Sequence, residues 1–234
     1  MKMKTLSVLA GVGAPLIATA SASAAFLGLK AVSKPNSFGL IVVSVYAEFD
    51  RPGEDFMRAV AGTANSPMLI QVLGGGTFYN HAFGSDTAPH GALIAAFPSL
   101  AFDTFVTVGA RQFTPTLPDA TVMTPGFPPL TGTQLFTTAS GWAVTPIDPQ
   151  GDPFNTDYSS GNGQILLGQF ATADGTGFNG TWAMRYQSSG QSAQSFQSFV
   201  YIVPAPGAVG LLGMAALFGA RCRRRLSGHS RTRA

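Results

Sequence analysis

Three residues that often bind metals or take part in catalysis lie close together in the chain, at His81, Asp86 and His90. Two imidazoles and a carboxylate could hold a divalent cation, or could activate Ser85 as a nucleophile. The segment has no HExxH arrangement and no third strong ligand, and it lacks the Gly-x-Ser-x-Gly turn that exposes a nucleophilic serine. We therefore expect a solvated loop here, with no metal and no catalytic residue.

A second group of oxygen-bearing side chains lies in the segment 146–163, which contains Asp148, Asp152 and Asp157. Oxygen-rich loops bind calcium, and Tyr158 could stack on a sugar ring. The spacing matches neither the EF-hand loop nor the nonapeptide calcium repeat, and Asp-Pro and Asn-Gly pairs such as those in this segment serve ordinary turns. We expect turn chemistry, with a ligand or calcium loop at these four residues as the alternative, and no other cofactor.

Further carboxylates and aromatic residues allow two weaker hypotheses. Glu48, Asp50, Glu54 and Asp55 could include a pair that hydrolyses a glycosidic bond. Their closeness in sequence, beside a Pro-Gly pair, indicates an exposed turn instead. Most aromatic side chains of an all-β domain lie in its core, so only aromatic residues in loops, such as Tyr158, are expected to meet a ligand.

These residues must be positioned by a central region whose pattern is typical of an all-β fold. Charged residues are sparse, and short runs of β-branched and aromatic residues alternate with segments rich in Gly, Pro, Ser and Thr. About seven to nine strands at this spacing predict a two-sheet β-sandwich or jelly roll. The expected strands are Phe38–Phe49, Pro67–Leu73, Phe102–Val108, Gly141–Thr145, Gln164–Thr172, Phe178–Gln187 and Ser195–Val203.

Two connecting segments carry specific expectations. The run Asp174-Gly175-Thr176-Gly177 lies between two expected strands and predicts a hairpin turn. The segment 114–132 contains five prolines and is not expected to form a central strand, because proline cannot donate to a β-ladder.

The distribution of charge excludes one class of partner. The whole chain has a net charge of +3, but two lysines lie before residue 5 and six arginines lie from Arg221 onward. Between residues 26 and 203 there are six basic and eleven acidic residues, a net charge of −5. A nucleic-acid-binding domain would concentrate basic residues on its folded part, so we expect no nucleic-acid partner.

The first 25 residues have the three parts of a secretory signal peptide. A lysine-containing start precedes an apolar run and then the small residues Ala22, Ala24 and Ala25, and signal peptidase would cleave after Ala24 or Ala25. We expect export through the Sec translocon. Cysteine usage agrees with a core-stabilised exported domain, because Cys222 is the only cysteine of the chain and no disulfide can form upstream of it.

The segment 203–225 begins with Val203-Pro204-Ala205-Pro206-Gly207, continues as a short run of Leu, Gly and Ala, and ends in arginines. The run from Ala208 to Ala220 is uncharged and would span about 20 Å as a helix, which is short of the roughly 30 Å hydrocarbon core of a membrane. A crossing is feasible when the segment is counted from Val203 and Arg221 and Arg223 extend to the interface. The basic cluster that would remain on the cytoplasmic side consists of Arg221, Arg223, Arg224 and Arg225.

This tail resembles the bacterial PEP-CTERM sorting signal, which has a Pro-Glu-Pro motif, a short transmembrane helix and a basic cluster. Here Ala205 stands where the motif has glutamate. The resemblance implies processing by an exosortase, a membrane protease that passes the protein on to the cell surface.

The expected organisation is a signal peptide at 1–25, an exported domain at 26–202, a sorting signal with a transmembrane helix at 203–225 and a disordered basic tail at 226–234. We expect a surface or extracellular protein, anchored in the membrane only transiently, that has a non-enzymatic structural, adhesive or matrix role. Two alternatives are a carbohydrate-binding module, calcium-assisted or not, that binds an extracellular polysaccharide, and a secreted hydrolase with an unrecognised site.

Overall fold

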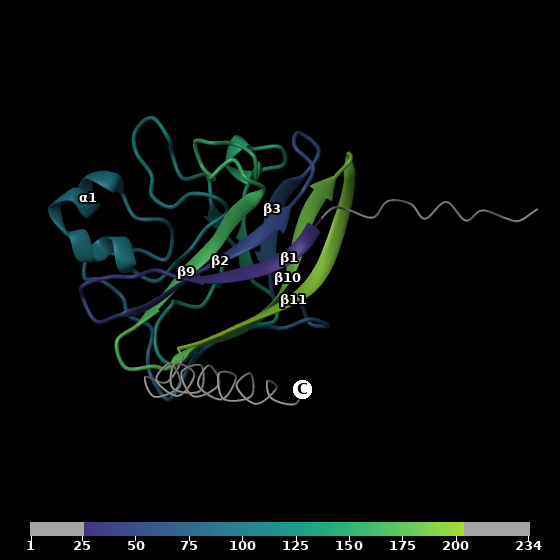
Figure 1. Cartoon of the computed structure of the whole chain (residues 1–234). Helices are drawn as coiled ribbons and strands as arrows, with labels where there is room; N and C mark the ends of the chain where they lie inside the picture. Colours follow the sequence, from purple (N-terminus) through teal and green to yellow (C-terminus); the bar gives the residue numbers. More distant parts are fainter. Residues whose placement is uncertain (1–25, 204–234) are drawn as a thin grey trace, which may run out of the picture.

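Alternating apolar and polar residues form two antiparallel sheets in the computed structural model, which describes residues 26–203 (Figure 1). The expected signal peptide and the sorting segment after Val203 lie outside the described residues. Within 26–203, no helix has the length and apolar character needed to cross a membrane. The two antiparallel sheets, with very little helix, confirm the all-β class and agree with a sandwich.

Sheet A has four strands in the order β1, β2, β9, β5. Its central strands bury one face in the core, because alternate residues of β2, including Val43 and Val45, point inward and are fully buried. The opposite face of β2 carries Ser44 and Tyr46. The bounds of the strands are Phe26–Ser33 for β1, Ile41–Phe49 for β2, Gln164–Thr172 for β9 and Phe105–Val106 for β5.

Sheet B has seven strands, and β10 lies at its centre. Along one edge β10 pairs with β11 over the whole length of both strands. Along its other edge it pairs first with β4 and then with β3. The bounds are Phe56–Ala61 for β3, Met68–Leu73 for β4, Val122–Met123 for β6, Gln134–Thr137 for β7, Gly141–Ala143 for β8, Gly177–Ser188 for β10 and Gln191–Ile202 for β11.

The register shows that β3 and β4 lie end to end along the same edge of β10. Ala61 pairs with Ala183 and Leu69 with Thr181, so the residues between β3 and β4 leave the sheet as a loop. In the same way, β8 and β7 lie end to end, with β8 paired to β3 and β7 paired to β4. Glycine is required at this break, because a Cβ on Gly62 would lie 2.1 Å from the Thr137 carbonyl oxygen.

Large aromatic side chains fill the core between the sheets. Trp182 of β10 is fully buried, and its ring centroid lies 5.8 Å from that of Trp142 and 5.0 Å from that of Phe199. Phe170 of β9 lies 6.5 Å from Trp182 across the sandwich. These contacts join β8, β10 and β11 of sheet B to the central strands of sheet A, so one hydrophobic core serves the described domain.

The chain between β4 and β6 covers part of the outer face of sheet A. It contains the short helix α1 (Gly91–Ala96) and the 3-10 helix η1 (Pro98–Phe102), which lie far from β10 and β11 in Figure 1. A second small apolar cluster forms beneath this segment, where Phe105 and Leu166 pack with Ala88 and Ala110. Sheet A therefore has its main core on one face and a loop-covered cleft on the other.

The structure corrects several expected elements. Gln164–Thr172 is confirmed to the residue, but Phe102–Val108 contains only the two-residue strand β5, because Phe102 belongs to η1. The Asp174–Gly177 turn is not a hairpin, since β9 pairs within sheet A and β10 within sheet B. Strands β1, β3, β6 and β7 were not predicted, and the described residues hold eleven strands rather than seven to nine.

Candidate ligand-binding clefts

The predicted polar trio lies in a loop where each side chain has a structural partner. His81 Nδ1 accepts from the Phe83 amide at 3.1 Å, and His90 Nδ1 caps α1 by accepting from the Ala92 amide at 3.0 Å. Asp86 accepts from the Leu130 amide at 3.3 Å. Across residues 26–203, no three His, Cys, Asp or Glu side chains are grouped so that they could hold a metal ion.

The carboxylates of segment 146–163 form turns of the kind expected. Asp148 accepts from the Gln150 amide at 2.9 Å, at the start of the 3-10 helix η2 (Pro149–Gly151). Asp152 accepts from the Phe154 amide at 2.8 Å. The exposed Asp157 forms no such bond, but its own amide donates to the Asn155 side chain at 2.8 Å. Two of the three carboxylates therefore serve the backbone of the loop itself.

Tyr158 is half-buried and links this loop to the outer side of sheet A. Its ring packs against the small apolar cluster, and its hydroxyl donates to the Pro118 carbonyl at 3.2 Å. Burial raises the pKa of Tyr158, and the charges of Asp148, Asp157 and Asp119 raise it further. Carboxylates therefore gather around the Tyr158 hydroxyl.

The carboxylate cluster after β2 does not form the uniformly exposed turn that we expected. Asp50 is exposed, but Asp55 is fully buried. The Asp55 carboxylate accepts from the Arg51 amide at 3.0 Å and from the Ser188 hydroxyl of β10. Asp55 thus ties the β2–β3 turn to sheet B.

The basic residues of the domain show an arrangement that the sequence did not indicate. Of the six between residues 26 and 203, only Lys30 forms an ion pair there, with Glu48 at 3.5 Å. Four of the other basic residues form two pairs, each lining one surface hollow: Lys34 with Arg111, and Arg58 with Arg185. In an acidic domain, this pairing of like charges distinguishes two surfaces.

The first surface, the sheet A cleft, lies on the outer face of sheet A and consists of two adjoining hollows of about 220 Å³ and 370 Å³ that share Lys34 and Arg111. Ser44 and Tyr46 of β2 and Gln169 of β9 line the smaller hollow, which has no carboxylate in its lining. The larger hollow is bordered by Asp157, Tyr158 and Ser159 of the long loop.

Neighbouring groups fix the positions of both cations in the sheet A cleft. The Lys34 ammonium donates to the Ala101 carbonyl at 2.9 Å and to Gln169 Oε1 at 3.4 Å. The Arg111 guanidinium lies over the Tyr46 ring, with Cζ 5.8 Å from its centroid, and donates to the Ser160 hydroxyl at 3.1 Å. Burial lowers the pKa of Lys34, and the charge of Arg111 lowers it further.

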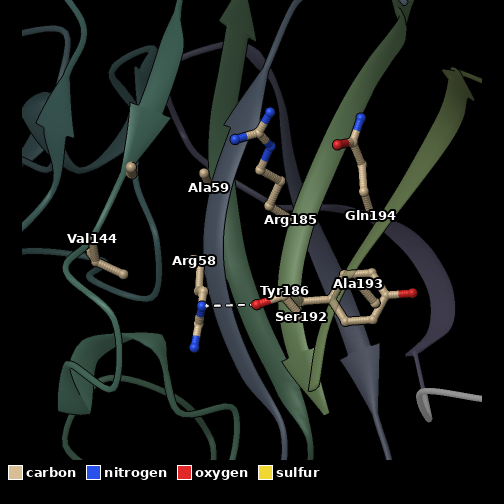
Figure 2. Close-up of a pocket in the computed structure, with 9 residues that line it drawn as sticks. Arg58, Ala59, Val144, Arg185, Tyr186, Ser192, Ala193 and Gln194 are labelled. Atoms are coloured by element: carbon tan, nitrogen blue, oxygen red, sulfur yellow. Dashed lines mark hydrogen bonds between the residues drawn. The ribbon is translucent and has the colours of Figure 1, made fainter. Parts of the chain in front are cut away.

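The second surface, the sheet B groove, lies on the outer face of sheet B and is drawn in Figure 2. Arg58 is the extra residue of a β-bulge, since Arg185 pairs with Ala59 and Tyr186 with Met57. Arg58 donates to the Ser192 hydroxyl of β11 at 3.2 Å and to the Gln187 side chain, and Arg185 extends in the opposite direction in Figure 2. The hollow has a volume of about 470 Å³, and no carboxylate lines it.

A buried carboxyl group in the segment between η1 and β5 predicts a dependence of stability on pH. Asp103 is 1% exposed and accepts from the His81 amide at 2.7 Å. Burial raises its pKa from the ordinary value of 3.8 to about 6, backbone hydrogen bonds from His81 and Thr104 oppose the rise, and the charge of Asp86 adds to it. Between these two values the folded domain keeps a proton that the unfolded chain has lost.

We expect this group to make the domain less stable as the pH rises from about 4 to about 6, by on the order of 2 kcal/mol. The stabilisation that the protonated Asp103 carboxyl gives the folded domain is present at pH values below this range and is lost above it. Urea unfolding of the wild type and of Asp103→Asn at several pH values measures the effect. The difference in unfolding free energy between the two proteins should change across the window, and an unchanged difference would contradict the assignment to Asp103.

No protein-family model, curated protein or solved structure matches this chain. Function is therefore inferred from the sequence and from the geometry of these two surfaces. Tyr158 was named only in the alternative hypothesis of a ligand loop, and it lines the larger hollow of the sheet A cleft, whereas Lys34, Arg111 and Gln169 were not predicted. They come from distant parts of the chain with no motif in common, so only the fold brings them together.

Proposed function

We propose that the chain is an exported surface or extracellular-matrix protein with a non-enzymatic structural or adhesive role. The observation that carries this proposal is the pair of flanking segments, a signal-peptide pattern at 1–25 and a PEP-CTERM-like tail at 203–225. The Sec translocon would export the chain, the tail would hold it in the membrane, and an exosortase would then process it near Pro204-Ala205-Pro206.

The domain between these segments has features that suit an extracellular environment. It has no cysteine and is stabilised by an aromatic core between two sheets, so its folding does not depend on disulfide formation. The predicted sites also leave few groups for chemistry, because His81, His90, Asp148 and Asp152 all hydrogen-bond to nearby backbone. These contacts support a binding or structural role over the alternative of a secreted hydrolase.

A carbohydrate-binding module is the second candidate function. The specific observation in its favour is the sheet A cleft, where Lys34, Arg111 and Tyr158 line a hollow open to solvent. The calcium-assisted form of this candidate has less support, because Asp148 and Asp152 each already accept a backbone amide within their own loop.

The sorting proposal predicts a change of location when the tail is removed. In cells, deletion of residues 208–225 should move the domain from the surface fraction into the periplasm or the medium, because both the membrane run and the arginine stop would be lost. Fractionation with mass spectrometry of the mature termini measures this. Deletion of 226–234 is the matched control and should leave the distribution unchanged. If removal of 208–225 leaves the protein where the wild type is found, the tail is not a sorting signal.

A further inference from the structure

The smaller hollow of the sheet A cleft is lined by two cations and no anion. Lys34 and Arg111 both border it, together with the hydroxyl groups of Ser33 and Ser44 and the amide of Gln169. The only ion pair between residues 26 and 203 is Lys30 with Glu48, so neither cation has a carboxylate partner there. Two like charges beside each other destabilise the charged state of both, and this cost falls when an anion lies between them.

The surrounding groups hold this arrangement in place without an anion. Gln169 is 3% exposed, and its amide nitrogen donates to the Asp103 carbonyl at 2.8 Å and to the Ala101 carbonyl at 3.1 Å. These bonds turn Gln169 Oε1 toward the Lys34 ammonium. On the other side, the Tyr46 ring supports the Arg111 guanidinium. The cations are therefore preorganised, which reduces the entropy lost when a ligand binds.

We propose that the sheet A cleft binds an acidic polysaccharide by placing one sugar carboxylate between Lys34 and Arg111. This inference deepens the carbohydrate-binding candidate and rests on that proposed function. The carboxylate occupies the smaller hollow, where an ammonium, a guanidinium and serine hydroxyls can donate to it. The rest of the sugar occupies the larger hollow against Tyr158 and Ser159.

The larger hollow favours a sugar acid over other anions. Asp157 lines it, and a carboxylate there accepts hydrogen bonds from sugar hydroxyls but repels a second negative charge. A uronate residue presents one negative charge beside several neutral hydroxyls, which matches a cationic hollow adjoining one with a carboxylate. A phosphate group concentrates more charge in one place, and an anionic membrane is a broad surface that does not enter a hollow.

Binding of a tetrasaccharide that carries one galacturonate and three neutral sugars to the purified full-length chain in detergent tests this inference by calorimetry. We expect Arg111→Ala and Lys34→Ala each to weaken binding by about 10-fold or more, because each removes one charged donor to the carboxylate. Arg185→Ala is the matched control, since it removes the same charge from the sheet B groove and should bind like the wild type. Binding of the wild type should also weaken as salt is raised.

Three ligands for comparison decide the chemical class. The methyl ester of the same tetrasaccharide should bind much more weakly, because it lacks the negative charge. Equal binding of the acid and the ester, or wild-type affinity in Arg111→Ala, would overturn the proposal. Inorganic phosphate or anionic phospholipid vesicles that bind at Arg111 more tightly than the galacturonate would overturn the sugar assignment.

Separate control experiments test the folding of the variants and the location of the protein. Thermal unfolding of Lys34→Ala and Arg111→Ala shows whether each variant is folded, and Lys34→Arg keeps the positive charge if alanine at this position disturbs the loop. Failure of galacturonate binding in a folded wild type overturns this inference and leaves the sorting proposal standing. If the tail deletion leaves the location of the protein unchanged, the sorting proposal is overturned and this inference still stands.

Discussion

Replacement of Trp182 by alanine should lower the free energy of unfolding by about 4 kcal/mol, the largest effect that we expect from a single substitution. Trp182 is fully buried at the centre of β10, and its ring contacts Trp142, Phe170 and Phe199. Truncation would remove the packing between the two sheets and leave a cavity that rigid strands cannot close. Urea denaturation monitored by circular dichroism measures the loss.

Conservative substitutions of the two tryptophans and a substitution of an exposed phenylalanine provide comparisons for this prediction. The Trp182 indole nitrogen has no hydrogen-bond partner among the described residues, whereas that of Trp142 donates to the Thr107 carbonyl at 2.9 Å. Trp142→Phe should therefore cost about 1 kcal/mol more than Trp182→Phe, because it removes a buried hydrogen bond as well. Phe196→Ala, on the exposed face of β11, should change stability by less than about 1 kcal/mol. A Trp182→Ala loss as small as that of Phe196→Ala would contradict the proposed core.

Substitution of Asp55 by alanine should cost about 2 to 3 kcal/mol, the second largest effect. The buried carboxylate accepts from the partly buried Arg51 amide and from the buried Ser188 hydroxyl, and both donors would lose this acceptor. The measurement is again equilibrium unfolding in urea. Loss of the bond to Ser188 should also loosen the end of β10, which amide hydrogen exchange can detect.

The nearby Asp50 supplies the matched control. It belongs to the same run of carboxylates but is exposed, so Asp50→Ala should change stability by less than about 0.5 kcal/mol. Equal effects at Asp50 and Asp55 would show that the turn tolerates loss of either carboxylate and that the bond to Ser188 contributes little.

Sequence patterns predicted the strands that are longest and richest in β-branched or aromatic residues. Gln164–Thr172 was found to the residue, and all of Phe178–Gln187 lies within β10, because apolar residues dominate both segments and turn residues bound them. The length of β5 was overestimated because the residues from Phe102 to Val108, including Asp103 and Thr104, follow an alternating pattern that is typical of a strand. The polar groups of Asp103 and Thr104 instead bond to the His81 amide and to the Ala171 carbonyl and amide.

Pairing between strands could not be predicted in the same way. The Asp174–Gly177 turn has the composition of a hairpin turn, yet the two strands that it connects lie in different sheets. Strand β9 pairs within sheet A, and β10 is the central strand of sheet B. The same limit applies to the sheet A cleft. Lys34 follows β1 and Arg111 lies in the segment between β5 and β6, and nothing local to either residue indicates that they border one hollow.

The position of β11 would have a mechanical consequence if the proposed tail tethers the domain by its C-terminal end. β11 pairs only with β10, and its final bonds join Val203 to the Thr176 carbonyl and pair Ile202 with Gly177. A pull on the chain beyond Val203 would load these terminal bonds first and would then open the β10–β11 ladder one pair after another. Because β11 also supplies Phe199 to the aromatic core, peeling the strand would expose Trp182. Tension along a tether would therefore be felt in the centre of the sandwich.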